Sequence, residues 1–164
     1  MSAPILNIEK LSFQKWSRGN ELRAEIGWAS NQLGSKKLGF NVTVVPPGKS
    51  AFPHHAHFGN EEMFFILAGE GSVRIGDGSH KIRTGDFISL PPGRKGAHQI
   101  INDSNAPLKY LAVSTMEIPE VVEYPDSGKL GVLAGAAPGR AASGDAIRHF
   151  TRVQDGVDYW DGEK

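Results

Sequence analysis

Apolar and polar residues alternate in short runs through the middle of the chain. Six runs rich in β-branched and aromatic residues occupy positions 39–45, 62–67, 72–75, 86–90, 98–102 and 108–113. Segments such as VVPPGKSAFP, IGDGSH and LPPGRKG lie between them, and their glycine, proline and aspartate content is typical of turns and loops. No window between residues 37 and 116 has apolar positions at helical spacing over three turns. Short strands separated by frequent turns indicate an all-β, antiparallel sandwich or barrel.

The same pattern divides the chain into a core and two extensions. The barrel is expected over residues 37–116. The N-terminal extension, residues 1–36, is expected to add edge strands to it. The C-terminal extension, residues 117–164, is expected to pack on the barrel, with the aromatic residues of its DYWDGEK ending returning to the barrel surface.

Composition narrows the possible functions. A chain of 164 residues suits one domain with a sizeable core. Eighteen basic residues balance eighteen acidic ones, so there is no electrostatic case for binding nucleic acid or an anionic membrane. There is no cysteine, so disulfides, thiolate nucleophiles and sulfur-rich metal sites are excluded, and any metal must be bound by nitrogen and oxygen. The N-terminus does not resemble a secretory signal and no apolar stretch is long enough to span a bilayer, so we expect a cytoplasmic protein.

The segment HHAHFGNEEMFFILAG, residues 54–69, places three imidazoles and two carboxylates beside an apolar run. Alternate side chains of a strand share a face, so His55 and His57 point the same way. We interpret FGNE as a hairpin connection that sets His57 opposite Glu62, with their Cβ atoms about 5 Å apart. Two imidazoles and one carboxylate placed in this way suit a cation held at about 2.0–2.2 Å.

Strand alternation separates the candidate ligands from their neighbours in sequence. A histidine from a distant segment is needed to complete a metal site. Glu61 and His54 fall out of phase and are expected to point away from it. A histidine pair with one intervening residue is more typical of a solvated strand face, and a nearby glutamate makes the two interpretations about even. His98 opens a later strand and shares a face with Ile100, which makes it the candidate that decides for a metal site.

These two segments resemble the two sequence motifs of the cupin superfamily. The residues that match the first motif are Gly48, His55, His57, Glu62 and Gly69. Those that match the second are Gly85, Pro91, Gly93, His98 and Asn102. The loops before His55 and before His98 are longer than usual, by one and two residues. The resemblance covers roughly residues 38–115, and the segments YPDSGKL and DYWDGE also resemble uncharacterised bacterial cupins, some of them labelled sugar-phosphate isomerase-like.

The resemblance implies a fold and a metal site. The fold is a single cupin-type double-stranded β-helix, a jelly-roll barrel with N- and C-terminal extensions. The residues that match the cupin ligands are His55, His57, Glu62 and His98, and they would bind one divalent metal ion. Three imidazoles and a carboxylate suit zinc, iron, manganese, nickel or copper, so the ligand types do not identify the metal. One or two coordination positions would stay open for water or substrate.

A substrate pocket is expected beside the metal. Its candidate apolar lining is Phe40, Phe64, Ile100 and Tyr110, which lie on expected strands; the alternative for the aromatic residues is an ordinary core position. Arg94 and Lys95 precede His98 and are candidates for binding a phosphate or carboxylate at the barrel mouth. The alternative for these two residues is a solvated basic turn.

Three functions remain open from the sequence. The first is a metal-dependent enzyme, isomerase-like or dioxygenase-like, that acts on a small polar or anionic substrate. The second is a module that binds a small molecule without turnover, and the third is a structural barrel with a vestigial site. We also expect a homodimer, because an open sheet edge favours pairing, with the N-terminal segment as a candidate exchanged strand.

Overall fold

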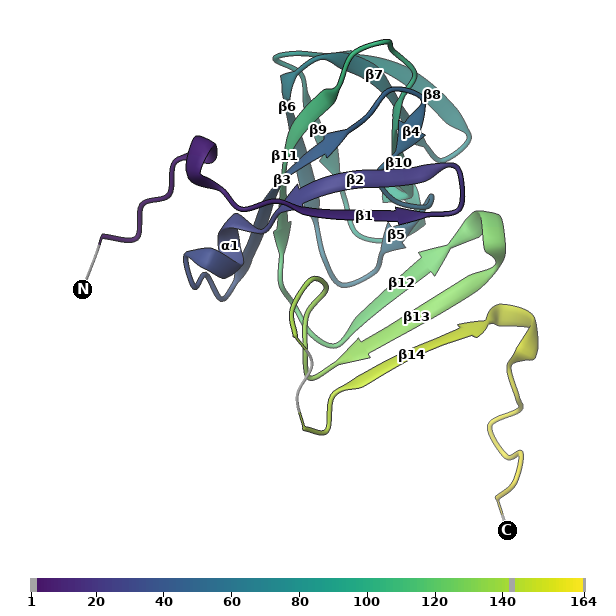
Figure 1. Cartoon of the computed structure of the whole chain (residues 1–164). Coiled ribbons are helices and arrows are strands. Elements are labelled where there is room, and N and C mark those ends of the chain that lie inside the picture. The colour runs from purple at the N-terminus through teal and green to yellow at the C-terminus, as the bar shows by residue number, and fades with distance from the viewer. Residues whose placement is uncertain (1–2, 142–143, 164) are drawn as a thin grey trace.

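The computed structural model describes residues 3–141 and 144–163, and nearly all of its regular structure is β-strand (Figure 1). The strands are β1 (Gln14–Arg18), β2 (Leu22–Gly27), β3 (Leu38–Val45), β4 (Lys49–Ser50), β5 (Ala56–His57), β6 (Glu62–Ala68), β7 (Glu70–Ile75), β8 (Gly78–Arg83), β9 (Phe87–Leu90), β10 (His98–Asn102), β11 (Leu108–Thr115), β12 (Glu120–Tyr124), β13 (Lys129–Ala134) and β14 (Ile147–Arg152). The helical elements are α1 (Ala29–Gln32) and the 3-10 turns η1 (Ile8–Lys10), η2 (Arg94–Gly96), η3 (Pro125–Ser127) and η4 (Val153–Asp155). No helix among the described residues is long and apolar enough to cross a membrane.

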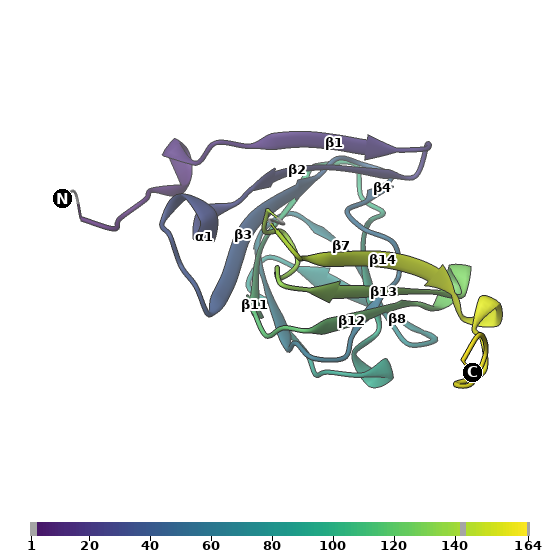
Figure 2. The same ribbon diagram turned by 90° about the horizontal axis from the view of Figure 1, so that it is seen from below.

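The strands form two sheets. A ten-stranded sheet has the order β8-β7-β10-β4-β2-β3-β11-β6-β9, with β1 paired to β2, and it curls into a barrel (Figure 1). A four-stranded sheet has the order β14-β13-β12-β5. Seen from below, β12, β13 and β14 lie across one end of the barrel (Figure 2). The predicted all-β barrel is therefore confirmed.

The strands predicted in the core are present, but the short strand β4, within VVPPGKSAFP, and the strand β8 were not predicted. β3, β6, β7, β9, β10 and β11 overlap the six predicted runs. The segment IGDGSH has the composition of a loop, but only Gly76 and Asp77 form the turn. The residues after them belong to β8, which pairs with β7 from Ile75–Gly78 to Glu70–Arg83. Most side chains of β8 are exposed and polar, and the strand follows a two-residue turn. Its sequence therefore has the composition of a loop.

The barrel interior follows from the alternation within each strand. In β6 the side chains of Phe64 and Ile66 are buried, and in β10 those of His98, Ile100 and Asn102 are buried. The Asn102 amide donates to backbone oxygens and is therefore satisfied inside the barrel. The interior is thus apolar between two polar positions of β10, His98 at one end of the strand and Asn102 at the other.

The predicted hairpin between His57 and Glu62 does not exist. β5 pairs with β12, so that His57 lies opposite Val122, whereas β6 pairs with β9 and β11. Residues 58–61 therefore cross from one sheet to the other. The crossing is favoured because polar groups in this segment find partners on the later strands, including Glu120 for the Phe58 amide.

The extensions differ in how closely they join the barrel. β1 pairs only with β2, and Trp16 packs on Phe52 with ring centroids 5.4 Å apart. At the other terminus, Tyr159 and Trp160 are 82% and 71% exposed, so the expectation that they return to the barrel was wrong. Residues 153–163 form no further strand (Figure 1). The rings of Tyr159 and Trp160 pack on each other, with their centroids 4.7 Å apart.

Candidate metal centre

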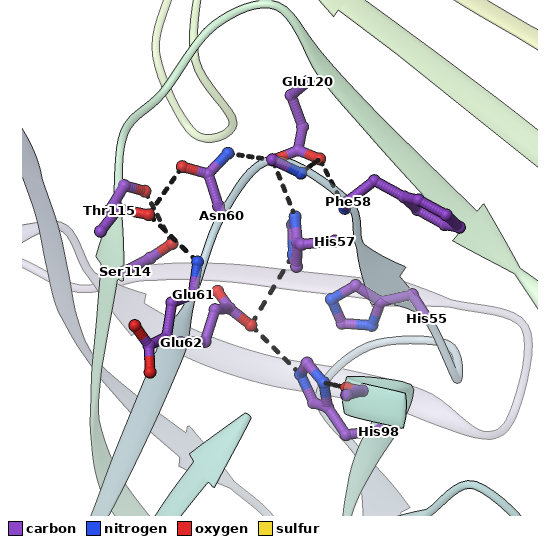
Figure 3. Close-up of polar contacts among 12 residues, drawn as sticks. His55, His57, Phe58, Asn60, Glu61, Glu62, His98, Ser114, Thr115 and Glu120 are labelled. Carbon is purple, nitrogen blue, oxygen red and sulfur yellow. Dashed lines mark hydrogen bonds and ion pairs between the residues drawn. The ribbon is translucent and has the colours of Figure 1, made fainter. Parts of the chain in front are cut away.

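Four side chains that the sequence singled out converge at the end of the barrel covered by the small sheet (Figure 3). The Nε2 atom of His98 lies 3.2 Å from Glu62 Oε2, and that of His57 lies 3.7 Å from the same oxygen. The ring of His55 is centred 4.6 Å from the ring of His98 and 5.1 Å from that of His57. One ligand atom each of His55, Glu62 and His98 lie within 4.8 Å of one another. The structure thus brings together residues that are up to 43 positions apart.

The backbone explains this convergence. His55 N donates to His98 O at 3.1 Å, and His98 N donates to His55 O at 2.8 Å, so the two residues form a reciprocal antiparallel bridge. Gly93 N donates to His57 O at 2.7 Å and ties the η2 loop to β5. Glu62 begins β6, opposite Leu90 of β9. The ligand-type side chains therefore come from paired strands and not from free loops.

Each imidazole has an oxygen beside its Nδ1 atom. His55 Nδ1 lies 2.8 Å from Pro53 O, and His98 Nδ1 lies 2.8 Å from Gly96 O. A carbonyl oxygen only accepts, so we assign the proton to Nδ1 in both rings, which leaves Nε2 unprotonated. His57 Nδ1 lies 3.5 Å from Glu120 Oε2. Metal-binding histidines in proteins are oriented by the same kind of contact.

Electrostatics prepare His55 and Glu62 for a cation, but favour the protonated form of His57. Burial, together with the neighbouring His98 and His57, lowers the pKa of His55 to about 3, so its imidazole is neutral at neutral pH. Burial alone would raise the pKa of Glu62, but the imidazoles of His98, His57 and His55 outweigh it and lower this pKa to about 2. Burial likewise opposes the charge on His57, yet Glu120 and Glu62 outweigh it and raise its pKa.

The residues present fit a divalent metal. The Nε2 atom of His98 is buried and has no hydrogen-bond partner among the described residues, although a buried polar atom is normally paired. Neutral imidazoles and a carboxylate are ligands for first-row divalent ions. A cation bound by these atoms would satisfy both the unpaired nitrogen and the buried negative charge of Glu62.

Glu120, which sequence reasoning missed, is the polar group that supports this centre from outside. Its side chain is fully buried in β12 and accepts from Phe58 N at 3.0 Å and Gly59 N at 3.2 Å. It also accepts from the Asn60 amide and contacts His57 (Figure 3). Burial raises its pKa, but the hydrogen bonds from His57, Asn60 and Gly59 outweigh this and lower it. The one signal in the sequence is its phase with Val122 in EVVEY, an acid on the apolar face of a strand.

A cavity of about 300 Å³ opens beside the four side chains. Phe40, Phe64, Ile100 and Tyr110 line it, together with His55, His57, Glu62 and His98. Arg94 and Lys95 are not part of its lining. Arg94 instead pairs with Glu123 at 2.8 Å on the outer surface, because the η2 turn directs its side chain away from the barrel mouth.

The two out-of-phase neighbours lie outside the centre. Glu61 is exposed, as expected from parity. His54 also points away from the cluster, but it is only 4% exposed and lies 3.5 Å from Asp126 Oδ1. The segment before β5 is thus covered on both faces, which alternation alone does not reveal.

Comparisons with known proteins agree with this geometry. Residues 41–114 match the family model described as Cupin domain. An uncharacterized protein of Methanocaldococcus jannaschii is 37% identical over 71 residues, which are 43% of this chain and 54% of that protein, so the chain matches about half the length of this relative. The oxalate-binding protein of Thermotoga maritima is 30% identical over 105 residues, 64% of this chain and 84% of that protein. The chain belongs to the cupin superfamily.

A solved structure has the same fold over almost the whole chain. It is that of a cupin-superfamily sugar phosphate isomerase from Silicibacter pomeroyi, with a TM-score of 0.76 and 21% identity. The match covers 96% of this chain and 98% of that protein, so the shared fold includes both extensions.

In this cupin the C-terminal extension forms the outer wall of the cavity. Its lining side chains from β12, β13 and β14 include Val122, Tyr124, Leu133, Ile147, Arg148 and Phe150. The loop after β13 reaches α1, where Asn31 Nδ2 donates to Gly139 O at 3.2 Å and Arg140 donates to Ser35 O at 2.7 Å. The candidate ligand residues thus come from the two cupin motifs, whereas the groups that face them across the cavity come from outside these motifs.

Proposed function

We propose that this cupin is a divalent-metal-dependent enzyme that acts on a small polar or anionic molecule in the cavity. One observation carries the proposal: three imidazoles and a carboxylate converge beside the cavity, and each imidazole has an oxygen within 3.5 Å of its Nδ1 atom. Side chains held in this way are oriented to bind a metal through their other nitrogen. His55, His57, Glu62 and His98 would hold the ion.

A bound divalent ion would supply Lewis acidity and, if redox-active, electrons for oxidation by dioxygen. The residues of the chain would do the remaining work. Phe40, Phe64 and Ile100 form an apolar wall that excludes bulk water from the reacting atoms. The small volume of the cavity, about 300 Å³, limits the substrate to a small molecule and restricts its orientation.

The cavity favours dioxygenase-like over isomerase-like chemistry. An isomerase needs a base beside the substrate carbon. Among the described lining residues, Glu62 is the only carboxylate, and the imidazoles are the three of the metal centre. Burial raises the pKa values of Tyr110 and Tyr124, so both stay protonated at neutral pH. A base independent of the metal ligands is therefore absent from the described wall, and oxidation at a metal does not require one.

A second candidate is a module that binds a small acid without turnover. It is favoured by the name of the Thermotoga maritima relative, which describes a protein that binds oxalate. The same four residues and the same cavity would serve this function. The two candidates differ only in whether product is formed.

Elemental analysis of protein purified without added metal tests the proposal first. We expect a first-row divalent ion near one equivalent, and oxygen uptake with some of a panel of small carboxylic acids, followed by mass spectrometry of the product. His57→Ala and Glu62→Gln should lose metal and oxygen uptake together. His80→Ala, which removes an exposed imidazole on β8, should keep both.

Three results would count against the enzyme. Turnover that survives complete removal of metal would show that the metal centre is not catalytic. Saturable binding of an acid with no product after prolonged incubation would instead support the binding module. Protein that neither contains nor takes up a divalent ion would refute metal binding in both candidates.

A further inference from the structure

Arg148 on β14 is a cation of the cavity wall without an acceptor. Arg140, the other arginine of that wall, donates to Asn31 and to Ser35 O. Arg74 pairs with Asp126 and Arg94 with Glu123. For Arg148, by contrast, the described part of the chain provides no hydrogen-bond acceptor and no ion pair. Its guanidinium is therefore available to a ligand in the cavity.

The position of Arg148 links it to the metal centre. The Tyr124 ring stacks on His55, with centroids 6.1 Å apart and planes at 22°. The Tyr124 ring in turn lies 6.2 Å from the Phe150 ring, measured between centroids. The Phe150 ring lies 5.9 Å from Arg148 Cζ and packs against it. His55, Tyr124 and Arg148 thus follow one wall from the metal-ligand residues to the outer strand.

Most of the remaining wall is apolar, although Ser30, Asn31, Asn41, Gln99, Ser114 and Arg140 also line it. Trp28, Phe52, Leu133 and Phe150 line it in addition to the side chains around the metal centre. Several polar side chains of this wall already have partners within the chain: Gln99 donates to Phe52 O, Ser114 donates to Thr115 O and Asn41 accepts from Thr43. A polyhydroxylated sugar placed here would lose hydrogen bonds to water and gain few from the protein, and that loss is costly. A ligand with an apolar carbon body avoids this cost.

We propose that Arg148 binds the carboxylate of a small organic acid with an apolar body, held with its other end toward the metal centre. The orientation of the ligand rests on the proposed function, whereas the contact with Arg148 does not. A guanidinium matches the geometry of a carboxylate, with two parallel hydrogen bonds. A single unpaired cation also balances the one charge of a carboxylate better than the two of a phosphate monoester.

Binding of phenylacetate tests the proposal, with Trp28 in the cavity wall as a fluorescent reporter and calorimetry as a second readout. The comparison probes are the neutral phenylacetamide, inorganic phosphate and glucose 6-phosphate, each measured with and without Mn²⁺. The variants are Arg148→Gln and Arg148→Lys. The matched control is Arg152→Gln on the same strand, whose guanidinium donates to Ser127 O at 3.0 Å and does not line the cavity.

We expect the natural chain and Arg152→Gln to bind phenylacetate equally, and Arg148→Gln to bind it at least tenfold more weakly. Arg148→Lys should recover part of the loss, and phenylacetamide should bind all four proteins alike. Because Arg148 is exposed on an edge strand, its variants should fold and contain as much metal as the natural chain.

Two outcomes would overturn the proposal. One is equal binding of phenylacetate by the natural chain and Arg148→Gln, including the case in which neither binds it. The other is tighter binding of phosphate or glucose 6-phosphate than of phenylacetate. If Mn²⁺ fails to bind but the Arg148 effect persists, the anion site stands and the metal proposal alone fails.

Discussion

A single buried carboxylate, Glu120, connects the metal centre to the small sheet. It is surrounded by donors from the backbone of residues 58–59, from the Asn60 amide and from His57. A charged acceptor in this position fixes both the imidazole and the loop that carries the chain from β5 to β6. Because loss of such a partner leaves buried donors unsatisfied, the effect of its removal should exceed that of removing a surface acid.

We predict that Glu120→Ala lowers affinity for Mn²⁺ by about 10–100-fold, the range found when partners of metal-binding histidines are removed. Glu120→Gln keeps an oxygen acceptor for the backbone donors and should lose less. Competition with a fluorescent chelator measures the affinity. The control is Glu123→Gln. Glu123 is an acid on the same strand, but it pairs with Arg94, so this variant should bind Mn²⁺ normally. Normal affinity in Glu120→Ala would show that His57 needs no such support.

His55 makes a second prediction at this scale, on the dependence of stability on pH. Its pKa falls from 6.5 to about 3 on folding, because burial and two neighbouring imidazoles oppose its charge. Between these values the unfolded chain binds the proton at His55 and the folded chain does not, so the contribution of His55 to the stability of the metal-free protein falls as pH falls through this window. The limit is about 1.4 kcal/mol per pH unit.

Urea unfolding of the metal-free natural chain and of His55→Gln at pH 7.5, 6 and 5 checks this effect. The stability advantage of the natural chain over the variant should shrink as the pH is lowered. His80→Gln, which removes an exposed imidazole of β8, is the matched control. A difference for His55→Gln that does not change with pH would mean that the His55 imidazole titrates normally in the folded protein.

Among elements, alternation predicted faces correctly but not partners. The phase of β6 placed Glu62 inward and Glu61 outward, and both positions are as expected. The predicted partner of β5 was wrong. β5 pairs with β12, which lies more than sixty positions later, in a segment without a motif. Turn residues such as FGNE are compatible with a tight hairpin and also with a crossing between sheets. The choice between them depends on distant acceptors, which a local pattern does not contain.

The loop from β9 to β10 gives a prediction for one glycine. A Cβ added at Gly96 would overlap the carbonyl oxygen of Pro91, and the backbone in contact cannot yield as a flexible side chain does. Gly96 O is also the acceptor for His98 Nδ1. Gly96→Ala should therefore reduce the free energy of unfolding by about 1–3 kcal/mol, as overpacking typically does, and weaken metal binding.

Gly59→Ala is the matched control for that loop. It also lies beside the centre, but its Cβ would sit 3.4 Å from Pro119 O, an ordinary contact distance. Urea unfolding and chelator competition on both variants separate packing from metal binding. If Gly96→Ala has the stability and the metal affinity of the natural chain, the loop can shift without moving His98.

At the scale of the whole molecule, the two motifs and the extensions have different roles. The family model ends at residue 114, and the four candidate ligand residues lie within it, so the resemblance to the two cupin motifs was enough to name them. The wall that faces them comes from β12–β14. Arg148 and Glu120 carry no motif, and their role depends on how the small sheet packs across the barrel. The sequence therefore predicts the site that cupins share, whereas the residues that would select a ligand became visible only in the structure.

The quaternary structure is the last prediction, and it concerns the N-terminal extension. β1 is an edge strand, and the segment before it extends from the barrel with Ile5 83% and Ile8 38% exposed (Figure 2). Exposed edges and apolar side chains favour pairing with another chain, so we propose a homodimer in which this segment crosses to the partner. Light scattering after size exclusion should give twice the chain mass of 17.7 kDa. A variant without residues 1–9 should be monomeric, and one without residues 157–164 should stay dimeric; a monomeric mass for the full chain would contradict the proposal.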